Sequence, residues 1–340
     1  MGMLAGLVGY GSGAKGIVRH PGSTEPWDRP DERVLVRWSS NASAVAIGPS
    51  WLITTRHQIT SPATVQIDGV TYRCLYQTDW QGGPTGKADM RLVKLLTETG
   101  EEAQLEKYVG LYIWSLEKGQ QVVIGGYGKG RGATLRSGGI AYGYAWAESG
   151  NTTLRWCHNV VDNTESNHES GLYTNAILIG DFDGVGEGGA TFYEGAPAEY
   201  DSGGGWFIRV GALWYLAGLS QDVEREGETW FRDKEEPLTA DPDLFVGVRI
   251  SPYAGWIAAR TSRPFCEASL SGDVTGDCRV TWADLERLLE YWLKDGCGPV
   301  NQYCAGADVS SDGRVGLADL AVLAEDWLRC ERYPAEACLY

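Results

Sequence analysis

The chain has 340 residues, of which 43% are hydrophobic, and a formal net charge of −16. Such an acidic chain is an unfavourable partner for nucleic acids and for anionic membrane surfaces. The sequence also has no apolar run of the roughly 18 residues that span a bilayer. We therefore expect no nucleic-acid partner and no membrane span, and the length suits one large core plus a smaller module.

The N-terminal stretch MGMLAGLVGYGSGAKG has a short apolar piece and several glycines but lacks a charged start. We interpret residues 1–15 as an N-terminal segment that is open to processing. It reads as the remnant of a signal peptide or as an added start, and not as an anchor.

From about residue 16 to residue 260, short alternating stretches are separated by glycine-containing turns. Strands are predicted at 33–38, 43–48, 90–96, 120–128 and 244–251. Many short strands of this kind are typical of antiparallel barrels or sandwiches, and the length suits two barrels of about 110 residues each. A helix is predicted at 251–261, with Tyr253, Trp256 and Ile257 on one face.

The stretch AEYDSGGGWF (198–207) places an aspartate before Ser202 and three glycines after it. A glycine cluster marks a place where the backbone comes close to another group. The same residues are also ordinary turn formers. Whether Ser202 is a nucleophile therefore depends on partners elsewhere in the chain.

The candidate base is one of four histidines. His57 ends the apolar stretch GPSWLITTRH, at a predicted strand end, whereas His158 and His168 lie in polar, asparagine-rich sequence and are predicted on surface loops. A carboxylate that orients the base is predicted at Asp89, directly ahead of an alternating strand. The order His57, Asp89, Ser202 excludes the α/β-hydrolase and subtilisin arrangements.

In this order the chain resembles the chymotrypsin (trypsin-like) serine protease family over about residues 16–260. The resemblance depends on IGPSWLITTRH, ADMRLVKL and YDSGGG, and on GGYG (125–128) and RISPYAGWI (249–257). It implies a mainly β fold with two six-stranded antiparallel β-barrels. It also implies peptide hydrolysis, with Ser202 as nucleophile, His57 as base and Asp89 as its orienting acid. The backbone amides of Tyr200 and Ser202 would form the oxyanion hole.

The chain departs from the family at two of these positions. Tyr200 stands where the family has glycine, so a left-handed backbone there would be strained. Gln58 stands where the family has a cysteine beside the histidine, so that local disulfide is lost.

The family's side-chain pocket has its base six residues before the nucleophile, here Ala196, and we place Gln221 in the same substrate pocket. An alanine gives no partner for Arg or Lys. Small or apolar substrate side chains are therefore expected, unless Glu199, Asp201 or Asp222 projects inward.

In activated members of the family, the aspartate before the serine binds a newly formed N-terminus. The corresponding residue here is Asp201. Ile17 lies 57 − 17 = 40 residues before His57, about where such a terminus would begin. Asp201 is expected to pair with a processed end near residue 16 or with an internal partner. A separate acidic stretch, GDFDGVGEGG (180–189), holds Asp181, Asp183 and Glu187. We interpret it as an acidic surface loop, with a calcium site as the alternative.

Residues 272–293 and 307–328 form an internal repeat with a constant offset of 308 − 273 = 35. Each copy opens with oxygen-bearing side chains at positions 1, 3, 5 and 12 of a loop, and position 7 would contribute a backbone carbonyl. This spacing suits calcium, which takes six to eight oxygen ligands. The predicted ligands are Asp273, Thr275, Asp277, Arg279 and Asp284 in the first copy and Asp308, Ser310, Asp312, Arg314 and Asp319 in the second. The alternative is a pair of acidic N-capped helices without an ion.

Over residues 272–330 the chain resembles a dockerin module, which implies two calcium ions and a cohesin-like domain of a scaffold or cell-surface protein as partner. The resemblance places the cohesin contacts near Trp282, Ala283, Leu317 and Ala318. Cys278 stands where glycine usually makes the turn. We assign 261–271 to a linker and 331–340 to a cysteine-containing tail.

Six of the eight cysteines crowd residues 266–338. This segment has no C-x-x-C pair and no histidine, so disulfides are favoured over zinc. Disulfides indicate an oxidising, extracellular location. The sequence does not decide whether Cys74 pairs with Cys157.

These features predict a secreted serine endopeptidase that acts on proteins or peptides, monomeric apart from a calcium-dependent tether to a cohesin-type partner, as in cellulosome-type assemblies. A catalytically inactive protease-like binding domain on the same tether is the alternative. A third possibility is a calcium-controlled adhesion module with an inert passenger.

Overall fold

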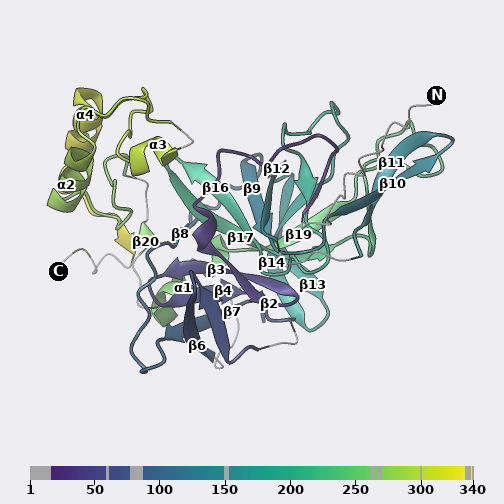
Figure 1. Ribbon diagram of the computed structural model, residues 1–340, viewed down its shortest axis with the longest axis horizontal. Helices are drawn as coiled ribbons and strands as arrows, with labels where there is room; N and C mark the ends of the chain where they lie inside the picture. The colour runs from purple at the N-terminus through teal and green to yellow at the C-terminus, as the bar shows by residue number, and fades with distance from the viewer. Residues whose placement is uncertain are drawn as a thin grey trace, which may run out of the picture.

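The computed structural model describes residues 17–58, 61–76, 87–148, 153–261, 265–266, 270–298, 301–333 and 338. A β-rich body makes up most of the molecule, and a small helical unit lies at one side of it, drawn in yellow-green in Figure 1. The predicted N-terminal segment 1–15, and parts of the predicted linker and tail, lie outside the described residues.

The first sheet of the body is a six-stranded antiparallel sheet in the order β2-β3-β4-β7-β6-β5. Its edge strands β2 and β5 also contact each other, so the sheet is nearly closed into a barrel. The strands are β2 (Leu35–Ser39), β3 (Ala42–Gly48), β4 (Trp51–Thr54), β5 (Thr64–Ile67), β6 (Val70–Tyr76) and β7 (Arg91–Leu96).

The second sheet has eight strands, in the order β12-β9-β16-β17-β19-β14-β13 with β8 paired to β17. They are β8 (Gly110–Leu111), β9 (Gln121–Gly126), β12 (Arg155–Val160), β13 (Asn163–Ser170), β14 (Tyr173–Asp181), β16 (Gly205–Val210), β17 (Leu213–Val223) and β19 (Leu244–Arg249). A separate three-stranded sheet contains β10 (Arg131–Ser137), β11 (Ile140–Trp146) and β18 (Glu228–Trp230). The short strands β1 (Val18–Arg19) and β15 (Gly195–Ala196) pair with each other.

The mainly β fold with a small helical C-terminal domain is confirmed. The second sheet is larger than the six strands expected, because the long β13–β14 hairpin extends it beyond β19. The predicted terminal helix is also present, as a 3₁₀ turn (Ser251–Tyr253) that continues into α1 (Ala254–Thr261).

One hydrophobic core joins the two sheets. Val45, Ile53 and Leu92 of the first sheet belong to the same buried cluster as Phe207 and Leu219 of the second. The residues that alternate with them, such as Ala44 and Leu52 on the first sheet and Trp206 on the second, are buried in two separate clusters, so these strands are buried on both faces. The shared core holds the two sheets together, so that residues at their facing strand ends keep a fixed geometry.

The helical unit is built from the sequence repeat. Its main helices are α2 (Trp282–Glu290) and α4 (Leu317–Glu325), with a short α3 (Gln302–Ala305) between them. Each repeat supports the other, because the N–H of Leu293 donates to the carbonyl of Val315 and the N–H of Leu328 donates to that of Val280, both at 2.9 Å. A two-stranded sheet of β20 (Phe265–Cys266) and β21 (Arg332–Tyr333) brings the two ends of the unit together.

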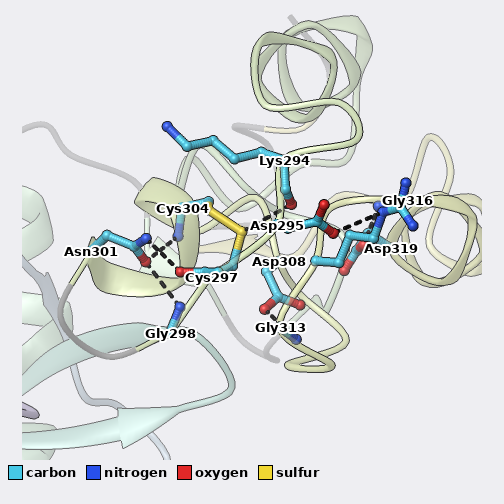
Figure 2. The surroundings of a disulfide bond; sticks show 12 residues. Lys294, Asp295, Cys297, Gly298, Asn301, Cys304, Asp308, Gly313, Gly316 and Asp319 are labelled. Atoms are coloured by element: carbon cyan, nitrogen blue, oxygen red, sulfur yellow. Dashed lines mark hydrogen bonds and ion pairs between the residues drawn. A yellow bond between two sulfur atoms is a disulfide. The ribbon is translucent and has the colours of Figure 1, made fainter.

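Disulfides crosslink the helical unit, as expected. Figure 2 shows the bond between Cys297 and Cys304, which closes the chain between the two repeats. A second bond joins Cys330 to Cys338, and Cys278 is also disulfide-bonded. By contrast, Cys74 and Cys157 are free and buried in the β body, so they do not pair.

The two parts meet through a cation–aromatic contact. The guanidinium of Arg209 on β16 lies 4.1 Å from the ring centroid of Tyr303 and donates to its hydroxyl at 3.1 Å. In the described part of the chain, no helix is long and apolar enough to cross a membrane.

Candidate active site and acidic loops

His57 and Asp89, the predicted base and its orienting acid, lie at the end of one antiparallel strand pair. Strand β4 ends at Thr54, which pairs with Arg91 at the start of β7. Asp89 precedes β7, and its Oδ1 accepts the backbone N–H groups of Arg56 and His57, both at 2.7 Å. These bonds fix the turn that carries His57 against the aspartate.

His57, Asp89 and Ser202 form one chain of hydrogen bonds. Nδ1 of His57 lies 2.5 Å from Oδ2 of Asp89, and Nε2 lies 2.8 Å from Oγ of Ser202. Asp89 is fully buried and its backbone N–H donates to the side chain of Asn175, whereas a third of the His57 side chain is exposed. A proton on Nδ1 would be held by the carboxylate, leaving the Nε2 lone pair for the serine hydroxyl.

The glycines after Ser202 allow its backbone to lie against β3 and β4. Gly203 has a φ of +78°, and a Cβ on it would lie 2.2 Å from the carbonyl of Ser43 and 2.3 Å from the hydroxyl of Thr54. The carbonyl of Ser202 also accepts the N–H of Ser43 at 2.9 Å. Glycine is therefore required at 203 both by conformation and by space.

Tyr200 adopts the left-handed backbone anticipated for its position, with a φ of +74°. Its ring lies 5.3 Å from Nζ of Lys129, which is ion-paired with Glu199. Within the residues that the structure describes, neither the N–H of Tyr200 nor that of Ser202 donates to a protein acceptor. Both amides remain available next to the serine hydroxyl.

Asp201 has internal partners. Its carboxylate is fully buried and accepts the backbone N–H groups of Gly128 at 2.6 Å, Ala198 at 2.9 Å and Ile17 at 3.4 Å. Burial raises the pKa of Asp201 to about 7, and the backbone hydrogen bonds oppose that shift. The carboxylate thereby ties the turn that carries Ser202 to Ile17, the residue just before β1.

The serine and histidine open into a cavity of about 640 Å³. Its walls include Gln221, a predicted pocket residue, but the other predicted pocket residue, Ala196, does not line it. Ala196 is buried and its backbone pairs with Val18. Glu199 and Asp222 line the cavity. Both carboxylates are among those expected from the sequence to change the preference for small or apolar substrate side chains.

The prediction that His158 and His168 lie on surface loops is wrong, because both lie on strands. His158 is buried on β12, where its Nε2 lies 3.1 Å from Oδ1 of Asp28, and burial lowers its pKa. His168 lies on β13. The asparagine-rich sequence suggested a loop, but both segments are strands of the second sheet, where β12 pairs with β9 and β13 pairs with β14.

The acidic residues around 181–187 are not gathered into a metal-ligand cluster in the described structure. Glu187 forms an ion pair with Arg232 at 2.9 Å. Burial and the neighbouring carboxylates of Asp162 and Asp183 raise the pKa of Asp181 to about 7.

The first acidic loop gathers three carboxylates. Oxygens of Asp273, Asp277 and Asp284 all lie within 4.8 Å of one another. Asp273 accepts the backbone N–H of Cys278 at 2.7 Å, and Asp284 accepts that of Thr275 at 2.9 Å. Burial and the nearby carboxylates raise the pKa of Asp273 to about 7. Arg279 lies two residues after Asp277, and its backbone N–H donates to Oδ1 of Asp277 at 3.0 Å.

The second acidic loop repeats this geometry. Oxygens of Asp308, Asp312 and Asp319 lie within 4.8 Å of one another, Asp319 accepts the N–H of Ser310 at 2.9 Å, and Asp312 accepts that of Arg314 at 2.9 Å. The turn needs a left-handed residue at its sixth position, which is Gly313 here (φ +92°) but Cys278 in the first loop (φ +66°). Hard carboxylate oxygens grouped in this way fit a calcium ion.

The helix starts beside these loops are exposed. Trp282 and Leu317 are 72% and 75% exposed, and Ala283 and Ala318 are also exposed. Asp284 caps α2 by accepting the N–H of Thr281 at 2.8 Å, so the capping role considered as an alternative coexists with the carboxylate cluster.

These features define a two-sheet β body with a Ser-His-Asp arrangement, joined to a small unit of two acidic loop–helix repeats. Residues 271–326 match the family model of the dockerin type I domain, and dockerin domains bind calcium and cohesins. Together with the disulfides, the dockerin match suggests an extracellular protein. No curated protein matches the chain.

Among the solved structures that the chain is similar to are two trypsin-like serine proteases. One is neuropsin, a serine protease expressed in the limbic system of mouse brain: 17% identity, 65% of this chain and 88% of that chain covered, TM-score 0.39. Another is kallikrein-related peptidase 10 in complex with Zn²⁺: 15% identity, 68% of this chain and 97% of that chain covered, TM-score 0.41.

Proposed function

We propose that the protein is a serine endopeptidase tethered through its dockerin to a cohesin-type partner. The observation that carries this proposal is the continuous hydrogen-bond chain from Asp89 through His57 to Ser202, with 2.5 and 2.8 Å between the bonded atoms. The buried acid, the partly exposed base and the hydroxyl at a cavity together suit acyl transfer.

In the proposed reaction, Oγ of Ser202 attacks the peptide carbonyl while Nε2 of His57 takes the hydroxyl proton. His57 then returns this proton to the leaving amine, and a water molecule repeats the sequence on the acyl-enzyme. Asp89 keeps the proton on Nδ1 and stabilises the imidazolium. The oxyanion would be bound by the N–H groups of Tyr200 and Ser202, because both are unused by protein acceptors in the described structure.

The tether would be formed by the two acidic loops, each with one calcium ion. In the first loop the ligands would be the side chains of Asp273, Thr275, Asp277 and Asp284 and the carbonyl of Arg279. In the second they would be Asp308, Ser310, Asp312 and Asp319 and the carbonyl of Arg314. The bound ion supplies positive charge that neutralises the grouped carboxylates. A cohesin would bind the exposed helix starts around Trp282, Ala283, Leu317 and Ala318, and the protein would work outside the cell.

A non-catalytic binding domain is the second candidate, and the strained φ of Tyr200 favours it. A non-glycine residue in this conformation costs roughly 1–3 kcal/mol. If the strain is relieved by rotating the peptide, the oxyanion hole is lost while the fold remains.

The proposal is tested by measuring turnover of a mixed peptide library by the full chain and by Ser202→Ala. If the three residues act as a unit, turnover should fall by about 10⁶-fold. Ser137→Ala, on β10 away from the cavity, is the matched control and should keep full activity. Peptide hydrolysis that survives Ser202→Ala would contradict the proposal.

A further inference from the structure

Gln58, the residue after His57, reaches the backbone of Ser202. Its side chain is only 8% exposed and lies at the wall of the catalytic cavity. Its Nε2 lies 2.9 Å from the carbonyl oxygen of Ser202 and 2.7 Å from Oγ1 of Thr55. Gln58 therefore connects the segment that carries the base to the residue that carries the nucleophile.

The surroundings fix the orientation of the Gln58 amide. The carbonyl of Ser202 can only accept, so the nitrogen and not the oxygen must face it. The two N–H groups of Nε2 lie within reach of three acceptors: the Ser202 carbonyl, Oγ1 of Thr55 and, at the longest distance of 3.1 Å, Oγ1 of Thr54, whose own hydroxyl donates to the carbonyl of Ser43 at 2.6 Å. Oε1 of Gln58 is buried and has no hydrogen-bond partner within the described residues.

The Ser202 carbonyl has two donors, one from each neighbouring segment. Ser43 on β3 supplies a backbone N–H at 2.9 Å, and Gln58 supplies the side-chain amide. The next residue, Gly203, packs so closely that a Cβ on it would lie 3.0 Å from Nε2 of Gln58. The nucleophile turn is thus held directly against Gln58.

We propose that Gln58 is a positioning residue that sets the separation between Nε2 of His57 and Oγ of Ser202. This inference rests on the proposed hydrolytic function, because it concerns the same two atoms. A misplacement of about 1 Å between reacting groups costs roughly 10²-fold in rate. The hydrogen bonds of Gln58 go to protein atoms, so its loss changes kcat and not KM.

Gln58→Met tests the role, because methionine has a similar length but no donor and also removes the unpaired Oε1. We expect kcat per active site to fall about 10–100-fold, with KM changed less than about 3-fold. The melting temperature should stay within about 2 °C of that of the unmodified chain. Gln66→Met, on the exposed face of β5, is the control and should change none of these quantities. Should Gln58→Met fail to fold, Gln58→Asn replaces it, since that amide is one methylene too short to reach Ser202.

Active sites are counted by phosphonylation with a fluorophosphonate, which separates the two levels of the argument. An unmodified chain that neither reacts nor hydrolyses peptides would refute the proposed function itself. If it reacts and Gln58→Met shows the same kcat per labelled site, the positioning role is overturned. A rise in KM at unchanged kcat would also overturn it, because it would indicate a substrate contact.

Discussion

Calcium removal should unfold the helical unit, because its carboxylates repel one another at short range. Three charges within 4.8 Å form three like-charged pairs. Each pair costs about 1 kcal/mol at the dielectric of water and about 3.5 kcal/mol at an effective dielectric of 20. At a pH well above the raised Asp273 pKa of about 7, where all three carboxylates are ionised, one loop without its ion is thus destabilised by roughly 3–10 kcal/mol, before the backbone hydrogen bonds to its carboxylates are counted.

This repulsion is comparable to the whole stability of the unit. A domain of about 60 residues is stable by roughly 3–9 kcal/mol at the usual free energy per residue. Without calcium, helices α2 and α4 should therefore melt, and the edge-to-face contact of Trp282 and Trp327, with ring centroids 5.3 Å apart, should be lost. The β body, which contains neither acidic loop, should keep its structure.

The assay combines far-ultraviolet circular dichroism and tryptophan fluorescence in EGTA with a calcium titration. We expect a loss of helix signal in EGTA, its recovery on adding calcium, and two ions bound per chain. Asp284→Asn should reduce the number to one, whereas Asp241→Asn, at an exposed carboxylate of the β body, should leave it at two. An unchanged helix signal in EGTA would refute the reasoning and indicate that the disulfides alone hold the unit.

Three further predictions concern the β body. His20 is buried, and its pKa is lowered because burial disfavours the charged form. Its contribution to stability is therefore present above its unfolded pKa of about 6.5 and is lost as the pH falls through the lower folded pKa. Between pH 7 and pH 5 the melting temperature of His20→Gln should fall less than that of the unmodified chain, and an equal fall would contradict this. Tyr200→Gly should relieve the roughly 1–3 kcal/mol of left-handed strain, less the entropy cost of glycine, so a higher urea midpoint with retained activity is the expected result. A clear decrease in that midpoint would show that the tyrosine ring contributes more than the strain costs. Because Glu199 and Asp222 line the cavity, peptides with glutamate at the cleavage site should show a kcat/KM about tenfold below glutamine analogues at low salt, and equal values would exclude an inward-acting acidic charge.

The hydrogen-bonded grouping of His57, Asp89 and Ser202 could be predicted because each residue has a local signal. An apolar strand ends just before His57, an alternating strand follows Asp89, and a glycine cluster follows Ser202. Each of these signals reflects a backbone requirement that can be read within about ten residues. The acidic loops could be predicted for the same reason, because the spacing typical of a calcium loop lies within one short segment.

Contacts between distant segments could not be predicted in the same way. The burial of His158 depends on Asp28 and on the ring of Tyr193, with ring centroids 5.0 Å apart, and neither residue is a neighbour in sequence. The contact of Asp201 with the N–H of Ile17, across 184 positions, was suggested only by the family resemblance, which left an internal partner open as the alternative. The bond from Gln58 to Ser202 spans 144 positions, and sequence alone showed only that a cysteine was absent.

The central claim is tested most directly by mass mapping of the full chain after reaction with a fluorophosphonate. The account predicts one phosphonyl group per molecule, on Ser202. No adduct on Ser202 under conditions that keep the fold intact would contradict it, and a peptidase role for the β body would have to be abandoned.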